Sequence, residues 1–95
     1  MFSLKNKNIV VTGSLGLLGR EFVESIAEYQ GNLILIDLDQ LKLDEQAKKI
    51  ETKYNIKCKG YSIDISKESN FQKKIKVILN EFQKIDGLIN NAANN

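Results

Sequence analysis

The sequence predicts an α/β fold in which helices cover both faces of a parallel, doubly wound β-sheet. Two observations support this fold. Four short runs are mostly rich in Ile, Val and Leu, and the three longer segments between them carry apolar residues at helical spacing. In addition, the glycine pattern T-G-x-x-G-x-x-G joins the first short run to the first helical segment. Because each helix returns the chain to the same end of the sheet, we expect parallel strands joined by right-handed crossovers.

The short apolar runs are the candidate strands. Such runs are typical of strands that are buried on both faces, as in a parallel sheet covered by helices. They occupy residues 8–12, 32–37, 58–64 and 86–91.

The candidate helices are identified by apolar stripes and by their boundary residues. The stripes consist of Leu18, Phe22 and Ile26, then Leu43, Ala47, Ile50 and Tyr54, and then Phe71, Ile75, Ile78 and Phe82. We expect Asp39 and Ser66 to be the N-caps of the second and third helices, since short polar side chains bond the free N–H groups there. Gly31 follows the first helix, where a left-handed C-terminal cap is expected.

Composition limits the classes of function. The chain has 95 residues, of which 42% are apolar, enough for one domain at most. The net charge is only +2 and the lysines are scattered, so we expect no nucleic-acid partner. Because Cys58 is the only cysteine and histidine is absent, neither a disulfide nor a zinc site is expected. No apolar run approaches the roughly 20 residues of a membrane span, and we expect a cytoplasmic protein.

The glycine loop is the first candidate site. Gly13 is expected to make a tight turn, Gly16 to let a pyrophosphate approach the backbone, and Gly19 to let the first helix pack closely. A phosphate would then face bare N–H groups at the positive end of the helix dipole. A nucleoside-triphosphate loop would need a lysine after the last glycine, where the chain has Arg20. The alternative is a tight turn without a ligand, and Arg20 faces either a cofactor phosphate or solvent.

Asp37 is the second candidate, at the end of the second strand. It follows Gly19 by 18 residues, close to the distance at which a carboxylate accepts hydrogen bonds from an adenosine ribose. A 2′-phosphate there would be repelled by the carboxylate, and neither Leu15 nor Leu38 is basic, so we expect NAD rather than NADP. Asp39 could compete for the ribose role, and Asp37 could instead be a plain loop or capping carboxylate.

Three segments resemble the landmarks of the short-chain dehydrogenase/reductase family, in the family's order. They are TGSLGLLG at 12–19, ID at 63–64 and LINNAA at 88–93. The resemblance implies a Rossmann-like sheet with the strand order 3-2-1-4, and residues 1–95 would be the N-terminal part of its dinucleotide-binding domain. It also implies that Asp64 and Ile65 contact adenine, that Asn91 and Ala92 line the cleft on the ribose side, and that Asn90 holds the fourth strand.

The predicted cofactor site combines both lines of inference. Its residues are Gly13, Ser14, Leu15, Gly16, Leu17, Gly19, Asp37, Leu38, Asp64, Ile65, Asn91, Ala92 and Ala93. The sequence departs from the family twice: the glycine spacing is that of the extended branch, whereas the NNA run fits the commoner branch, and Ala93 stands where the motif has glycine.

The family's catalytic residues have no counterpart in the sequence. They are a serine and a Tyr-x-x-x-Lys pair, but Tyr29, Tyr54 and Tyr61 are followed four positions later by leucine, cysteine and isoleucine. We therefore expect the NAD-binding segment of an oxidoreductase that transfers hydride between an alcohol and a carbonyl. The alternative is a nucleotide-binding or interaction module without catalysis. In either case we expect an exposed sheet edge after the fourth strand, which favours self-association.

Overall fold

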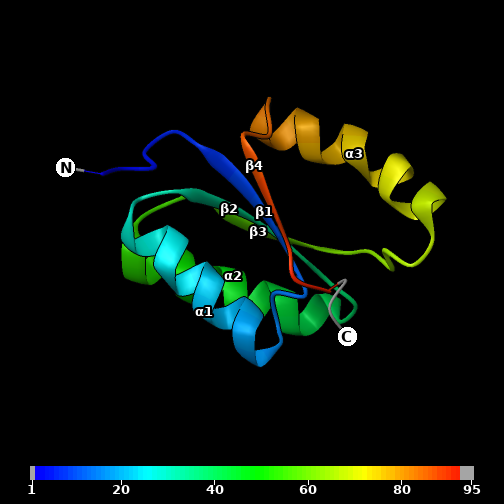
Figure 1. Cartoon of the computed structure of the whole chain (residues 1–95), viewed down its shortest axis with the longest axis horizontal. Helices are drawn as coiled ribbons and strands as arrows, with labels where there is room; N and C mark the ends of the chain where they lie inside the picture. The colour runs from blue at the N-terminus through cyan, green and yellow to red at the C-terminus, as the bar shows by residue number, and fades with distance from the viewer. Residues whose placement is uncertain (1, 93–95) are drawn as a thin grey trace.

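The computed structural model describes residues 2–92 and confirms the predicted α/β fold. The elements alternate along the chain, as β1 (Asn8–Thr12), α1 (Leu17–Glu28), β2 (Asn32–Asp37), α2 (Gln40–Tyr54), β3 (Cys58–Ser62), α3 (Glu68–Phe82) and β4 (Gly87–Asn90). The strands form one parallel sheet with the order β3-β2-β1-β4, as expected. Helices α1 and α2 cover one face of the sheet, and α3 lies over the other (Figure 1).

The core has two layers because successive residues of a strand point to opposite faces. Val11, Leu33 and Leu35 pack with buried residues of α1 and α2 on one side. On the other side Ile34 and Ile36 pack with Ile78, Phe82 and other residues. Every interior position of β2 is therefore apolar, which explains why its run reads as continuous rather than alternating.

The register of the sheet brings the carboxyl ends of all four strands to the same edge. Thr12 of β1 pairs with Ile36 of β2 on one side and with Asn90 of β4 on the other. Asp37, at the end of β2, pairs with Ser62 of β3. The loops that follow these ends share the carboxyl edge of the sheet, where ligands of such folds bind.

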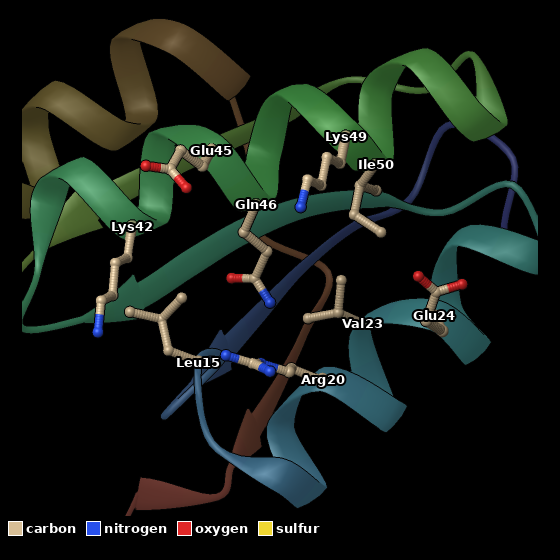
Figure 2. A pocket seen from close by; sticks show the side chains of 9 residues that line it. All are labelled: Leu15, Arg20, Val23, Glu24, Lys42, Glu45, Gln46, Lys49 and Ile50. Atoms are coloured by element: carbon tan, nitrogen blue, oxygen red, sulfur yellow. The ribbon is translucent and has the colours of Figure 1, made fainter.

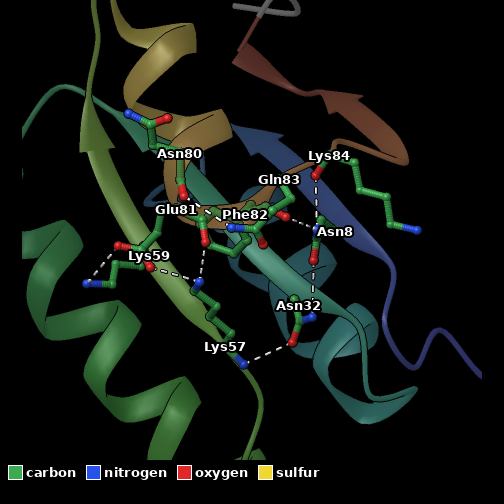
Figure 3. Close-up of polar contacts among 9 residues, drawn as sticks. All are labelled: Asn8, Asn32, Lys57, Lys59, Asn80, Glu81, Phe82, Gln83 and Lys84. Atoms are coloured by element: carbon green, nitrogen blue, oxygen red, sulfur yellow. Dashed lines mark hydrogen bonds and ion pairs between the residues drawn. The ribbon is translucent and has the colours of Figure 1, made fainter.

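The opposite edge of the sheet is held together by the side chain of Asn8 (Figure 3). Its amide nitrogen donates to the carbonyls of Phe82 and Lys84 at 3.0 and 2.9 Å, and its carbonyl oxygen accepts from the Asn32 amide at 3.1 Å. Asn32 in turn accepts a hydrogen bond from the backbone of Lys57. Asn8 thus connects β1, β2 and the turn before β4.

Two predicted strands are shorter than expected. The third ends at Ser62 rather than at residue 64, and the fourth covers Gly87–Asn90 rather than residues 86–91. The difference lies at the ends of strands, where backbone groups turn to loop partners. For example, the Ile63 N–H still donates to the Asp37 carbonyl after β3 has ended.

Two of the predicted caps are wrong, and one is confirmed. Asp39 accepts a hydrogen bond from the Lys42 N–H, as an N-cap does. Ser66 is not a cap, because its N–H and hydroxyl both bond the Asp64 carboxylate and α3 begins two residues later. After α1, the left-handed residue is Gln30 (φ 71°) rather than Gly31. Gly31 is needed for space instead, since a β-carbon there would lie 2.7 Å from Ile26 Cγ2.

The apolar stripe of α1 also differs from the expected one. Leu18 is 53% exposed, whereas Gly19, Val23, Ile26 and Ala27 are buried. The helix is turned so that Gly19, rather than the leucine before it, faces the loop that follows β1. The close approach of Gly19 to the loop is therefore compatible only with the orientation that also buries Val23, Ile26 and Ala27.

Candidate functional site: the cleft at the carboxyl edge

Gly13 makes the turn that leads out of β1. Its φ is +67°, in the left-handed region that favours glycine. A β-carbon at this position would also lie 3.0 Å from Asn91 Nδ2 and 3.2 Å from Ala92 N. The turn therefore requires glycine both for backbone conformation and for the close approach of the segment after β4.

Gly19 and Gly16 fulfil different requirements, as the sequence suggested. A β-carbon on Gly19 would lie 2.0 Å from the Gly13 carbonyl oxygen, so only glycine allows α1 to pack against the loop. A β-carbon on Gly16 would meet only that same oxygen, at 3.5 Å, and would otherwise point into open space. Gly16 is also the N-cap of α1, and no side chain caps the helix there. Gly16 thus presents backbone without a side chain to the cleft, directly before the first turn of α1.

Asp37 lies beside this loop. Its Oδ2 accepts a hydrogen bond from the Leu15 N–H at 2.9 Å, and its Oδ1 accepts from its neighbour Leu38 at 2.9 Å. A carboxylate has about four lone-pair positions, so both oxygens retain capacity for ligand hydroxyl groups. The two candidate features of the sequence, the glycine loop and the acid, are therefore in direct contact.

A cleft of about 500 Å³ lies between these elements and the loops after β3 and β4. This volume is within the range of ordinary ligand sites. Nine predicted site residues line the cleft: Gly13, Leu15, Gly16, Asp37, Leu38, Asp64, Ile65, Asn91 and Ala92. Ile36, Ile63 and Ser66 complete the lining and were not predicted as site residues.

Three other predicted residues do not line the cleft. Ser14 is fully buried and faces α2, Gly19 is buried against the loop, and Leu17 is 88% exposed at the start of α1. The prediction for Ala93 lies outside the described residues 2–92.

Asp64 supplies a second carboxylate to the cleft. The hydroxyl of Ser66 donates to Asp64 Oδ1 at 2.6 Å and the Ser66 N–H donates to the same atom at 3.1 Å. These two bonds, the hydroxyl first, hold the pKa of Asp64 below its ordinary value. Asp64 therefore stays ionised at neutral pH and can accept hydrogen bonds from a ligand.

The end of β4 is fastened to β1 by polar side chains. The Thr12 hydroxyl donates to Asn90 Oδ1 at 3.0 Å and accepts from the Ala92 N–H at 3.2 Å. The Asn91 amide donates to the Gly13 carbonyl at 3.3 Å. Asn90 thus helps to hold β4, in agreement with the expectation, and Asn91 closes one wall of the cleft onto the glycine turn.

A second cavity, of about 380 Å³, lies behind the glycine loop between α1 and α2 (Figure 2). Arg20, which we considered for a cofactor phosphate, is exposed and lines this second cavity rather than the cleft. Between the two cavities stands Leu15, which lines both of them.

The α3 lysines and the single cysteine do not line the cleft. Lys73, Lys74 and Lys76 are exposed on α3. Cys58 is 1% exposed, and burial followed by the charge of Glu51 raises its pKa to about 12, so the thiol is protonated and unreactive. Among residues 2–92, no group of three or more side chains could hold a metal ion. None of the helices in this range is long and apolar enough to cross a bilayer.

Gln46, on α2, is a further residue of the site that was not predicted from the sequence. Its amide bonds both the hydroxyl and the carbonyl of Ser14 in the glycine loop. A signal for it was present, because Gln46 directly precedes Ala47 and lies between Leu43 and Ile50 on the apolar stripe of α2. A polar side chain at the border of an apolar stripe needs a buried partner.

Similarity to known proteins is consistent with the fold and the cleft described above. The sequence profile of the short chain dehydrogenase family matches residues 7–95. The very-long-chain 3-oxoacyl-CoA reductase of Vanderwaltozyma polyspora is 40% identical over 93 residues, which cover 95% of this chain and 26% of that protein.

Two solved structures share the fold. The NADPH-dependent 3-quinuclidinone reductase of Rhodotorula rubra has a TM-score of 0.85 and 25% identity, over 93% of this chain and 33% of that one. An NAD+-bound xylitol dehydrogenase has a TM-score of 0.82 and 22% identity, over 90% of this chain and 32% of that one. The chain thus spans a third or less of the length of these three proteins. Both the profile and the fold lead to one conclusion: the chain belongs to the short-chain dehydrogenase family.

Proposed function

We propose that this chain binds the adenosine diphosphate part of NAD and belongs to an NAD-dependent oxidoreductase. The observation that supports this most directly is the hydrogen bond between Asp37 and the backbone of Leu15. This bond joins the acid that would bind the ribose to the loop that would hold the pyrophosphate. A turn without a ligand would need no such arrangement beside an open cleft.

The residues of the cleft fit the chemistry of a dinucleotide. The backbone at the start of α1, next to Gly16, would hold the two phosphates, because the free N–H groups of the first helical turn and the helix dipole favour an anion there. Asp37 would accept hydrogen bonds from the adenosine ribose. Ile65 and the Asp64 carboxylate, at the opposite side of the cleft, would contact adenine.

Charge favours NAD over NADP in this proposal. A 2′-phosphate carries about −1.5 to −2 charges at neutral pH. One unit charge placed 4 Å from a carboxylate costs roughly 4 kcal/mol at an effective dielectric constant near 20. Leu15 and Leu38, the cleft residues on either side of Asp37, offer no cation to offset this repulsion. NADP would bind only if the chain relaxed around Asp37.

Titration of the chain with NADH and with NADPH tests the assignment, and the Asp37→Ala variant isolates the acid. We expect NADH to bind with a Kd between micromolar and millimolar, about −8 to −4 kcal/mol, and NADPH to bind more weakly. Asp37→Ala should weaken NADH binding and reduce the difference between the affinities for NADH and NADPH. Equal affinities in the unmodified chain would overturn the preference for NAD, and no binding of either cofactor at millimolar concentration would overturn the cofactor site.

In the complete oxidoreductase of this proposal, NAD(H) accepts hydride from an alcohol or supplies it to a carbonyl. The contribution of this chain is to bind and orient the cofactor, since residues 1–95 contain no Tyr-x-x-x-Lys pair. We place this activity in the cytoplasm, where a protonated, unpaired Cys58 is compatible with a reducing environment.

We further propose that the chain associates with itself through β4. Among the described residues, β4 pairs only with β1, so its other edge presents unpaired backbone groups. Leu88 on this strand is 60% exposed. Size-exclusion chromatography at micromolar concentration should show dimers or larger species, and a monodisperse monomer would contradict this proposal.

A further inference from the structure

The glycine loop is held from behind by one residue of α2. Gln46 lies opposite Ser14, 32 positions away in sequence. The Ser14 hydroxyl donates to Gln46 Oε1 at 3.0 Å, and Gln46 Nε2 donates to the Ser14 carbonyl at 2.7 Å. Figure 2 shows the Gln46 side chain extending from α2 toward the loop, beside Leu15. The amide thus bonds both a side chain and a backbone group of one loop residue.

The two sides of the loop are therefore fixed by different elements. On the cleft side the Leu15 N–H donates to Asp37, at the end of β2. On the far side Gln46 bonds Ser14, whose side chain is fully buried. The adjacent residues Ser14 and Leu15 are therefore bonded to different elements, α2 and the end of β2. Such two-sided contact restricts the backbone more than either contact alone, because the loop cannot rotate about one anchor.

We propose that Gln46 is a positioning residue for the phosphate-binding backbone of the glycine loop. This inference rests on the proposed function and adds a residue that does not line the cleft. Without the amide, the Ser14 carbonyl and hydroxyl lose their partner on α2, and the backbone from Ser14 to Gly16 samples other conformations. Fewer of these present the N–H groups of the helix start to a pyrophosphate, so phosphate binding weakens more than binding on the adenosine side of the cleft.

The chain offers a matched control on the same helix. Gln40 also uses its amide to bridge α2 to another element: Nε2 donates to the Gly60 carbonyl at 2.9 Å, and Oε1 accepts from the Ser62 N–H at 2.8 Å. These bonds hold β3 rather than the glycine loop. A Gln→Ala substitution at either position removes a similar number of hydrogen bonds, but only the one at Gln46 frees the loop.

The test compares ADP, which carries a pyrophosphate, with adenosine, which carries none. Both are titrated into the chain by NMR, which measures millimolar affinities residue by residue. We expect Gln46→Ala to raise the Kd for ADP about three- to tenfold, the range of one net hydrogen bond, and to raise the Kd for adenosine by a smaller factor. Gln40→Ala should leave the ratio of the two affinities as in the unmodified chain.

The outcomes separate this inference from the proposed function. If the unmodified chain binds ADP no better than adenosine, the phosphate site itself is wrong, and the inference fails with it. Suppose instead that the unmodified chain prefers ADP. If Gln46→Ala keeps that preference, or lowers the affinities for ADP and adenosine by the same factor, the positioning role is wrong and the cofactor site stands. Should Gln46→Ala fail to fold, Gln46→Glu keeps the size and the acceptor but cannot donate to the Ser14 carbonyl. Gln46→Glu should show the same selective loss of affinity for ADP, and an unchanged preference for ADP over adenosine would overturn the proposal.

Discussion

Asp37 Oδ2 and Leu15 N are 2.9 Å apart, and the hydrogen bond between them joins the end of β2 to the middle of the glycine loop. The same carboxylate also caps the N–H of Leu38. One side chain thus orders two loops of the cleft before any ligand binds. Preorganisation of this kind reduces the entropy lost on binding.

The first prediction concerns this bond in the ligand-free chain. Asp37→Ala removes the acceptor of the Leu15 N–H, and hydrogen bonds to charged groups contribute about 1.5–3 kcal/mol. Amide exchange at Leu15, followed by NMR, should become about tenfold faster or more. Asp39→Ala is the control, because it removes the N-cap of α2 but no partner of Leu15. Equal exchange rates at Leu15 in Asp37→Ala and the unmodified chain would show that the bond does not order the loop.

The second prediction separates two glycines of the loop. In Gly19→Ala the new methyl group would lie 2.0 Å from the Gly13 carbonyl oxygen, which forces α1 away from the loop. We expect a loss of about 2–4 kcal/mol in the free energy of unfolding, measured by urea denaturation. In Gly16→Ala the new methyl group meets open space. The loss in the free energy of unfolding should therefore stay near the roughly 1 kcal/mol that a poorer N-cap costs.

Ligand binding should separate the two variants further, because only Gly16→Ala is expected to lose affinity for ADP without a large loss of stability. Gly16 lines the cleft and a β-carbon there meets open space, so we expect Gly16→Ala to lose affinity for ADP while remaining folded. If it kept full ADP affinity, the phosphates would have to bind elsewhere than against Gly16.

The third prediction concerns the amino edge of the sheet. Asn8→Ala leaves the carbonyls of Phe82 and Lys84 without their donor and removes the acceptor of the Asn32 amide. Loss of buried hydrogen bonds of this kind costs about 2–4 kcal/mol, which urea denaturation would measure. Asn80→Ala is a control on exposed α3 surface and should change stability by no more than about 0.5 kcal/mol. A similar loss in both variants would mean that the contacts of Asn8 are not what stabilises the edge.

The fourth prediction is that the stability of the fold depends on pH through the ionisation of the Asp86 carboxyl group. The Asn8 N–H donates to Asp86 Oδ2 at 2.8 Å, and this bond lowers the pKa of Asp86, with a smaller effect from Lys84. Because the pKa is lower in the folded chain, the stabilisation is present above the ordinary value near 4 and is lost as pH falls through the folded value. Asp86→Asn should therefore lower Tm at pH 7, and the difference from the unmodified chain should shrink toward pH 3. A difference that is constant with pH would exclude the carboxylate charge as its source.

The fifth prediction concerns Cys58. Its pKa of about 12 lies above the ordinary value near 8.5, so at pH 8 the folded chain holds about a thousandfold less thiolate. Iodoacetamide should label the native chain slowly and the urea-unfolded chain at the normal rate, as mass spectrometry would show. Since burial favours the neutral thiol, its contribution to stability is complete below about pH 8.5 and declines as pH rises toward 12. Rapid labelling of the native chain would indicate that β3 opens readily.

Much of the architecture was predictable because it depends on local patterns. The periods of the apolar residues located all seven elements, and the parallel order followed from helices that return the chain to one end of the sheet. The glycine spacing likewise predicted separate needs for Gly13 and Gly19, because a turn and a close helix approach each exclude a β-carbon. These features require only neighbours in sequence and the geometry of a strand or helix.

Other features depend on which side chains meet after packing. The rotation of α1, which exposes Leu18, buries Gly19 against Gly13 together with an apolar stripe of Val23, Ile26 and Ala27. The position of Ser66 in the sequence predicts an N-cap, but in the structure both of its hydrogen-bond donors, the N–H and the hydroxyl, bond the Asp64 carboxylate. In both cases a local preference was overridden by a stronger neighbour.

The sequence by itself determined the parallel α/β fold, the glycine loop and the placing of an acid at the end of β2. Only the tertiary structure decided that Asp37 bonds Leu15, that Gln46 bonds Ser14 and that Asn8 joins the strands at the opposite edge. The physical reason is one of range. Periodicity and backbone conformation act over a few residues, whereas these hydrogen bonds join residues 22, 32 and 76 positions apart and form only when helices and strands have packed.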